Sequence, residues 1–174
     1  MTTYVALLRA VNVGGTGKLT MRRLRSICGE AGFARVETYI ASGNVVFDSN
    51  AKAASVKAAL EARLAAELGK PAGVVLRSAS EMAAVAAANP FPHGEARHTY
   101  AFFLDAAPPR DALDAVKGQS DEQLARGKRE IFVHYPSGMG RSKLRIAAAR
   151  AGTARNMNTV AKLAEMAARR KTTR

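Results

Sequence analysis

The alternation of apolar and polar positions divides the first half of the chain into short strands and amphipathic helices. Strands are predicted at residues 4–8, 36–40, 45–47 and 74–76. Helices are predicted at residues 21–31, with Thr20 as the N-cap, and at residues 55–68. Leu24, Ile27, Cys28 and Ala31 follow the i, i+3, i+4, i+7 spacing of one buried helical stripe, which Gly32 ends. The resulting order, βαββαβ, is that of a ferredoxin-like unit.

The second half is predicted to repeat a strand, a helix, a hairpin and a helix. A short helix capped by Ser80 leads into a linker at residues 89–97. After it we expect a strand at residues 99–104, a short helix around residues 111–116, hairpin arms at residues 121–125 and 130–135, and a terminal helix with Val160, Leu163, Ala164 and Ala167 inward. The prediction is an α+β protein of two ferredoxin-like (βαββα-type) units with antiparallel or mixed sheets, divided into residues 1–88 and residues 98–174.

A glycine-rich stretch follows the first predicted strand. The strand ends at Arg9, and the turn after it contains Asn12, Gly14, Gly15 and Lys18. Glycines let backbone N–H groups approach a ligand, and a helix N-terminus attracts anions. The spacing matches neither a P-loop nor a dinucleotide-binding fingerprint. A phosphate site is therefore one hypothesis, and a turn that needs glycine only for its shape is the other.

The predicted topology brings a second turn to the same place. Strands one and two of a ferredoxin-like unit run parallel, so their carboxyl ends share one edge of the sheet. The turn formed by Ser42, Gly43 and Asn44 follows strand two. We therefore expect this turn to face the glycine-rich loop after strand one.

Charge adds a possible polyanion partner. The 174-residue chain has 27 Lys and Arg against 14 Asp and Glu, which gives a net charge of +13. Residues 141–174 hold ten of these cations and one acid, including three cations in the last turn of the terminal helix. Such a basic region suits nucleic acid or another polyanion, but a solvated arginine-rich surface with a basic tail is the explanation that the sequence alone favours.

Polar residues near the second half's glycine-rich turn are further candidates. Ser142 and Lys143 follow the turn at residues 136–140, and the polar segment TARNMNT contains Arg155, Asn156 and Asn158. Arg155 suits a bidentate contact with phosphate or carboxylate, or an ion pair in the core. Either asparagine could instead cap the terminal helix. Arg9 is either a snorkelling surface residue or a fixed charge beside the glycine-rich loop.

Conventional catalytic sets are sparse. A single cysteine, Cys28, excludes an internal disulfide and fits a reducing, cytoplasmic compartment. The three histidines show no metal-ligand spacing, and no carboxylate pair stands out for acid–base catalysis. No apolar run approaches the ~20 residues needed to span a bilayer. We therefore predict neither metal nor cofactor, and enzymatic activity stays open.

Five separated motifs resemble those of a known bacterial family, a domain of unknown function of about this length. They are LLRAVNVGG at residues 7–15, SGN at residues 42–44, NPF at residues 89–91, SKL at residues 142–144 and TARNMNT at residues 153–159. The resemblance covers nearly the whole chain, although Met157 stands where members often have Trp. It implies a two-part α+β fold and no established activity, substrate or catalytic residue.

The leading functional hypothesis is binding of an anionic or phosphorylated ligand, a nucleotide or RNA, in a cleft lined by glycine-rich turns. The alternatives are a small metal-independent enzyme acting on an anionic metabolite and a protein-interaction or regulatory module. The candidate ligand-binding residues are Arg9, Asn12, Gly14, Gly15, Lys18, Ser42, Gly43, Asn44, Ser142, Lys143, Arg155, Asn156 and Asn158.

Overall fold

The structure, a computed structural model, describes residues 1–9, 11 and 19–170. Contacts divide the chain into two compact units, which are described separately. The first unit contains Met1–Ala83 and Leu163–Arg174, and the second contains Ala84–Lys162. The terminal helix was predicted to belong wholly to the second half, whereas its last part groups with the first unit.

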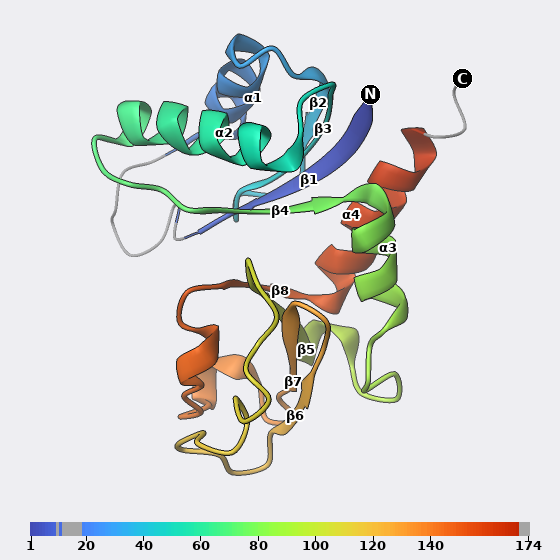
Figure 1. The fold of residues 1–174 in the computed structure, drawn as a ribbon. Coiled ribbons are helices and arrows are strands. Elements are labelled where there is room, and N and C mark those ends of the chain that lie inside the picture. The colour runs from blue at the N-terminus through green and yellow to red at the C-terminus, as the bar shows by residue number, and fades with distance from the viewer. Residues whose placement is uncertain (10, 12–18, 171–174) are drawn as a thin grey trace. The chain divides into compact units, whose positions relative to one another are not determined.

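The first unit has the predicted ferredoxin-like order (Figure 1). Its elements are β1 (Thr2–Leu8), α1 (Met21–Glu30), β2 (Ala34–Thr38), β3 (Asn44–Ser49), α2 (Ala53–Leu68) and β4 (Val74–Ser78). The sheet order is β2-β3-β1-β4, and each neighbouring pair is antiparallel. Because β1 and β2 both run antiparallel to β3, they are parallel to each other, as predicted.

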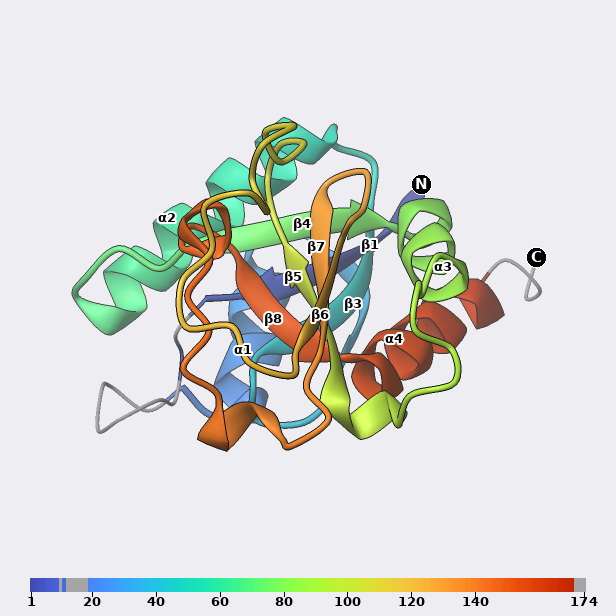
Figure 2. The same cartoon turned by 90° about the horizontal axis from the view of Figure 1, so that it is seen from below.

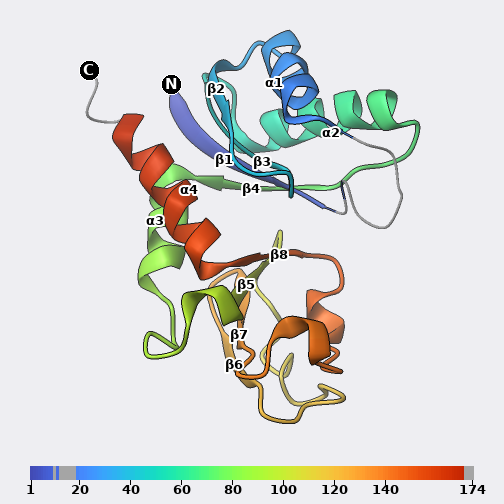
Figure 3. The ribbon, with the colours of Figure 1, turned by 180° about the vertical axis from the view of Figure 1, so that it is seen from behind.

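Helices α1 and α2 cover one face of this sheet, as Figures 1 and 3 both show. The Thr20 hydroxyl accepts a hydrogen bond of 3.0 Å from the Arg23 amide and caps α1 as predicted. Leu24, Ile27 and Cys28 are buried, which confirms the apolar stripe of this helix. Their side chains join a core cluster most of whose other members come from α2 and from alternate positions of β1, β3 and β4. The face that α1 buries against the sheet is therefore the apolar stripe seen in its sequence.

The second unit repeats the strand order without matching helices (Figure 2). It contains β5 (Thr99–Phe103), β6 (Gln123–Arg126), β7 (Glu130–His134) and β8 (Thr153–Asn156), ordered β6-β7-β5-β8 with every neighbour antiparallel. The short 3₁₀ helices are η1 (Ala96–His98), η2 (Met139–Arg141) and η3 (Ala147–Ala149). The predicted helix around residues 111–116 is wrong, since these residues form turns. So short a segment gains too few hydrogen bonds to offset the cost of helix nucleation.

The caps of the last two helices differ in part from expectation. Helix α3 (Ala79–Ala87) is capped by Ser78 rather than Ser80, because the Ser78 hydroxyl accepts from the Glu81 amide at 3.2 Å. The Glu81 carboxylate in turn accepts from the Ser78 amide at 2.8 Å, which completes a capping box. In α4 (Met157–Arg169), the four apolar residues expected to face inward are all buried. Within the described residues, no helix combines the length and apolar character required to cross a membrane.

Two glycines in the first unit give a matched test of packing. Gly43 has φ +85°, and an added Cβ would lie 2.7 Å from Val11 Cγ2 and 2.9 Å from Leu8 Cβ. Gly29 lies in α1, and an added Cβ there meets nothing within 4 Å. We expect Gly43→Ala to lower the free energy of unfolding by about 2 kcal/mol or more, from steric overlap and left-handed strain. Gly29→Ala should raise it by about 0.5 kcal/mol. Urea denaturation measures both, and equal effects would contradict the packing described.

Candidate functional site

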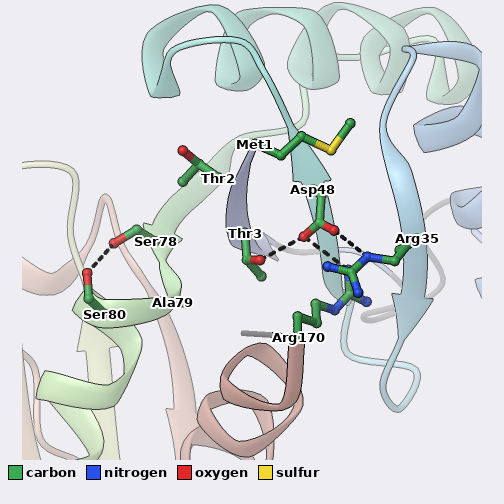
Figure 4. Close-up of a pocket in the computed structure, with 9 residues that line it drawn as sticks. All are labelled: Met1, Thr2, Thr3, Arg35, Asp48, Ser78, Ala79, Ser80 and Arg170. Carbon is green, nitrogen blue, oxygen red and sulfur yellow. Dashed lines mark hydrogen bonds and ion pairs between the residues drawn. The ribbon is translucent and has the colours of Figure 1, made fainter. Parts of the chain in front are cut away.

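A cavity of about 690 Å³ lies in the first unit (Figure 4). It opens at the end of the sheet where β1 begins and where β3 and β4 end. The residues that line it are Met1, Thr2, Thr3, Arg35, Asp48, Ser78, Ala79, Ser80 and Arg170. Its volume is that of a typical small-molecule site.

The carboxylate of Asp48 is the centre of the polar wall. Its side chain is only 3% exposed, although it lies in a strand whose other members are apolar or small. The strand register places Thr3 opposite Asp48, and the Thr3 hydroxyl donates to Asp48 Oδ1 at 2.7 Å. Arg35 Nε donates to Oδ2 at 2.5 Å, and Arg170 Nη1 donates to Oδ1 at 3.4 Å. One buried carboxylate thus receives two guanidinium groups.

Arg35 reaches Asp48 through an irregular piece of backbone. Its φ is +50°, and the pairing of β2 with β3 shifts register between Ala34 and Glu37. Such a bulge changes the direction in which a side chain points, and a left-handed non-glycine residue costs about 1–2 kcal/mol. Only Nε of this guanidinium bonds to another described residue, while the side chain is 52% exposed. Both terminal nitrogens therefore retain donors that solvent or a ligand can use.

Arg170 approaches the same carboxylate from the end of α4. Its side chain is 4% exposed and also donates to Glu37 Oε1 at 3.1 Å and to the Val46 carbonyl at 3.3 Å. Its Nε is buried without a hydrogen-bond partner among the described residues. In the sequence this arginine is one of the three cations in the last turn of the terminal helix, a region for which a solvated basic surface was one expectation. The structure corrects that interpretation, because Arg170 is buried in an ion-pair network.

The charged side chains that line the cavity are predominantly positive. Burial alone raises the pKa of Asp48, but hydrogen bonds from Thr3 and Arg35 and the charges of Arg170 and Arg35 outweigh it and lower that pKa. Two cations and one ionised carboxylate therefore line the cavity. Glu37, the other partner of Arg170, is 54% exposed and lies outside the lining. Water screens its charge more than that of Asp48.

The predicted turn after β2 lies against the residues that begin the glycine-rich loop. The Leu8 amide donates to the Gly43 carbonyl at 2.9 Å, and the Gly43 Cα hydrogen position faces Leu8 and Val11. Asn44 is buried and closes the hairpin, because its Nδ2 donates to the Tyr39 carbonyl at 2.9 Å and to Ser42 Oγ at 2.8 Å. These contacts give Asn44 a structural role.

The remaining candidates of the first unit include Arg9, whose side chain packs over Gly73. Asn12, Gly14, Gly15 and Lys18 lie outside the described residues. None of the predicted residues that the structure describes lines the cavity at Asp48. The register explains this result, since Leu7 pairs with Asn44 at one end of the strands and Thr3 pairs with Asp48 towards the other.

Ser142 and Lys143 lie in the second unit, on a smaller cavity of about 290 Å³. Ser142 Oγ donates to Glu122 Oε1 at 2.5 Å. This hydrogen bond is the main cause of the lowered pKa of Glu122, and hydrogen bonds from backbone amides, including that of Ser120, lower it further. The lining contains Arg141 and Lys143 but also Asp121 and Glu122. The charges balance, so this glycine-rich cavity is less suited to an anion than the one at Asp48.

The segment around Arg155 is a strand and a helix start rather than an open loop. Arg155 is buried in β8, where its Nη1 donates to Thr153 Oγ1 at 2.7 Å and to the Ala154 carbonyl at 2.9 Å. Burial lowers the pKa of Arg155 to about 10, so it stays charged at neutral pH. Asn156 Oδ1 accepts from the Thr159 amide at 2.9 Å and caps α4, whereas Asn158 is exposed. A ligand contact by these residues stays a prediction.

Metal and thiol chemistry find little support in the part of the chain that the structure describes. No group of three or more His, Cys, Asp and Glu residues there is placed to hold a metal ion. Cys28 is buried, and burial raises the pKa of its thiol to about 12. A thiol protonated at neutral pH is a poor nucleophile, and Cys28 is a core residue.

The repeated strand order defines an α+β protein built from two ferredoxin-like sheets. The chain belongs to the family described as protein of unknown function (DUF1697), which matches residues 1–132. It is similar in structure to the conserved bacterial protein SP0830 from Streptococcus pneumoniae, with a TM-score of 0.81 and 27% sequence identity over 97% of this chain and 99% of that one. No match is found among proteins of curated function.

Replacing Asp48 tests the ion-pair network. Asp48→Asn leaves two guanidinium groups around a neutral amide, so the free energy of unfolding should fall by about 3 kcal/mol at pH 7. The pKa of Asp48 is lower in the folded than in the unfolded protein. The ionised carboxylate therefore adds to the free energy of unfolding at pH values above its unfolded pKa of about 4. This added stability is lost as the pH falls through the folded pKa. The gap between wild type and variant should therefore narrow below about pH 4. Urea denaturation from pH 7 to pH 2.5 measures it, and a constant gap would argue against an ionised Asp48.

Proposed function

We propose that this protein binds a small anionic ligand, such as a phosphorylated metabolite or a mononucleotide, in the cavity at Asp48. The Arg35 guanidinium carries the proposal. Arg35 adopts a left-handed backbone conformation within the bulge of β2, which places its guanidinium at the cavity. The terminal nitrogens of this guanidinium have no partner among the described residues. A guanidinium fork matches the geometry of phosphate and carboxylate.

The strained position of Arg35 supports a functional role. A regular β2 would satisfy the same backbone hydrogen bonds at lower conformational cost, whereas the bulge brings this one side chain to Asp48. Strained backbone is concentrated at sites where geometry serves function. Asp48 fixes Nε and thereby orients the two free ends of the guanidinium fork.

The opposite wall of the cavity offers complementary donors. Ser78 and Ser80 line it and lie at the start of α3, a nine-residue helix. The hydroxyls of these two serines are 3.2 Å apart (Figure 4). A helix N-terminus carries partial positive charge and attracts phosphate. An anion held by Arg35 would therefore face the serine hydroxyls and the start of α3, although the Glu81 carboxylate of the capping box offsets part of the positive charge there.

The size of the cavity favours a small molecule over a polymer. A volume of about 690 Å³ lies within the usual range for drug-sized ligands. Nothing in the lining carries the stacked aromatic rings typical of single-stranded RNA recognition. The chain has a single cysteine, as is usual for proteins of the reducing cytoplasm, and we therefore propose a cytoplasmic metabolite as the ligand.

Arg35→Ala tests the site. We expect pyrophosphate to raise the melting temperature of the wild-type protein, and its affinity to fall about 10- to 100-fold in the variant, the equivalent of about 1.5–3 kcal/mol for a charge-assisted bond. Arg22→Ala is the control, because Arg22 is an exposed cation on α1 away from the cavity. Calorimetric titration in a phosphate-free buffer, with inorganic phosphate and AMP as further probes, gives the affinities.

The titrations separate a specific site from general attraction to a basic protein. Binding should weaken with added sodium chloride in both the wild type and the control variant. Equal affinity of wild type and Arg35→Ala for all three probes would refute the proposed site. Equal loss in Arg22→Ala and Arg35→Ala would show attraction by net charge alone, which also contradicts the proposal.

A further inference from the structure

A separate cavity of about 230 Å³ lies in the second unit, on the face of the sheet that carries irregular segments instead of helices. We propose that it binds a small aryl carboxylate or a similarly sized apolar anion. Its lining is formed by Phe102, Tyr135, Leu144, Arg145, Ile146, Ala149 and Arg150. The proposal is independent of the ligand assigned to the cavity at Asp48, because different residues in a different unit carry it.

The floor of this cavity is aromatic and rigid. Phe102 comes from the central strand β5, and Tyr135 directly follows β7. Tyr135 packs edge-to-face against Tyr100, with ring centroids 5.6 Å apart and an interplanar angle of 84°. Burial, with a smaller contribution from the charge of Glu122, raises the pKa of Tyr135 to about 12, so its ring stays neutral. A flat apolar group finds favourable stacking geometry on such a floor.

The wall of the cavity is fixed by backbone contacts. The Lys117 amide donates to the Arg145 carbonyl at 3.0 Å, and the Arg145 amide donates to the Lys117 carbonyl at 2.8 Å. The next residue, Gly118, lies so close to the Lys143 carbonyl that an added Cβ would be 2.2 Å from its oxygen. Leu144 and Ile146 are therefore held in place before any ligand arrives, which reduces the ordering cost of binding.

The rim of the cavity carries positive charge. Arg145 and Arg150 are both exposed, and no carboxylate lines the cavity. The guanidinium of Arg145 forms no hydrogen bond or ion pair with another described residue. An anionic head group at the rim would meet two cations while its apolar body contacts the floor. This separation of apolar and cationic surface defines the class of ligand.

The volume narrows the class further. The cavity is smaller than the 300–1,000 Å³ of typical drug-sized sites and equals the liquid volume of about eight water molecules. It can accept one ring system but not a whole nucleotide. The floor also offers few hydrogen-bond partners for the ring nitrogens of a nucleobase, and buried polar groups without partners weaken binding. An unsubstituted aromatic ring with one carboxylate therefore fits best.

The composition of the chain makes the test direct. It contains four tyrosines and no tryptophan, so the fluorescence of 2-naphthoate can be excited with little protein background. Titration followed by fluorescence anisotropy should show saturable binding to the wild-type protein. The neutral isostere naphthalene-2-carboxamide should bind at least tenfold more weakly, because it lacks the charge that complements the rim. Absence of saturable naphthoate binding, or equal binding of the carboxamide, would overturn the proposal.

Charge-matched variants locate the site. Arg145→Ala/Arg150→Ala should weaken naphthoate binding at least tenfold, whereas Arg110→Ala/Lys128→Ala removes the same charge from exposed positions outside the cavity and should leave it unchanged. Arg145→Gln alone, which keeps the side chain's apolar stem, should weaken binding several-fold and provides the readout if the double variant does not fold. Arg35→Ala should have no effect. Equal losses in both double variants, or loss in Arg35→Ala, would place the probe elsewhere and contradict the proposal.

Discussion

The first unit contains a buried carboxylate, that of Asp48, whose charge the surrounding structure has to compensate. A charge with only 3% of its side chain exposed is strongly unfavourable unless hydrogen bonds and opposite charges compensate it. Three separate pieces of structure supply that compensation. The strand register supplies Thr3, a bulge in β2 supplies Arg35, and the end of α4 supplies Arg170. Because two cations share one carboxylate in the lining, the cavity has a net positive charge, on which the proposed anion site depends.

The two units show how one strand order supports two kinds of surface. In the first, α1 and α2 build a continuous apolar core, and the cavity opens at the end of the sheet. In the second, turns and 3₁₀ segments cover the equivalent strands. The two cavities described in the second unit are smaller, and these irregular segments form part of their lining. The candidate sites therefore differ in charge and shape although the sheets are alike.

Sequence patterns predicted the features that depend on neighbouring residues. The apolar stripe of α1, its Thr20 cap and the turn at Gly43 follow from local periodicity and turn chemistry, and the structure confirms each of them. The ferredoxin-like order of the first unit was predicted for the same reason. Strand β8 was not predicted, because its polar sequence hides an edge strand, and the helix expected around residues 111–116 was wrong.

The residues around Asp48 could not be found in this way, because they are distant in sequence. Arg35 lies 13 residues from Asp48, and Arg170 lies 122 residues from it. One signal was available, namely an acidic residue, Asp48, directly after the apolar run at residues 45–47 of β3. Asn44 and Asn156 were also candidate ligand contacts, with a helix cap as the alternative for Asn156, and in the structure their short side chains bond to nearby backbone. Polar side chains near a turn or a helix end often form hydrogen bonds with the local backbone instead of binding a ligand.

The most direct test of the central claim is the titration of the Asp48 carboxyl carbon, followed by NMR in the wild-type protein and in Arg35→Ala. A carboxylate shared by two guanidinium groups should titrate below the ordinary aspartate value of about 3.9, and its midpoint should rise when Arg35 is removed. A midpoint at or above that value, unchanged by the substitution, would contradict the account.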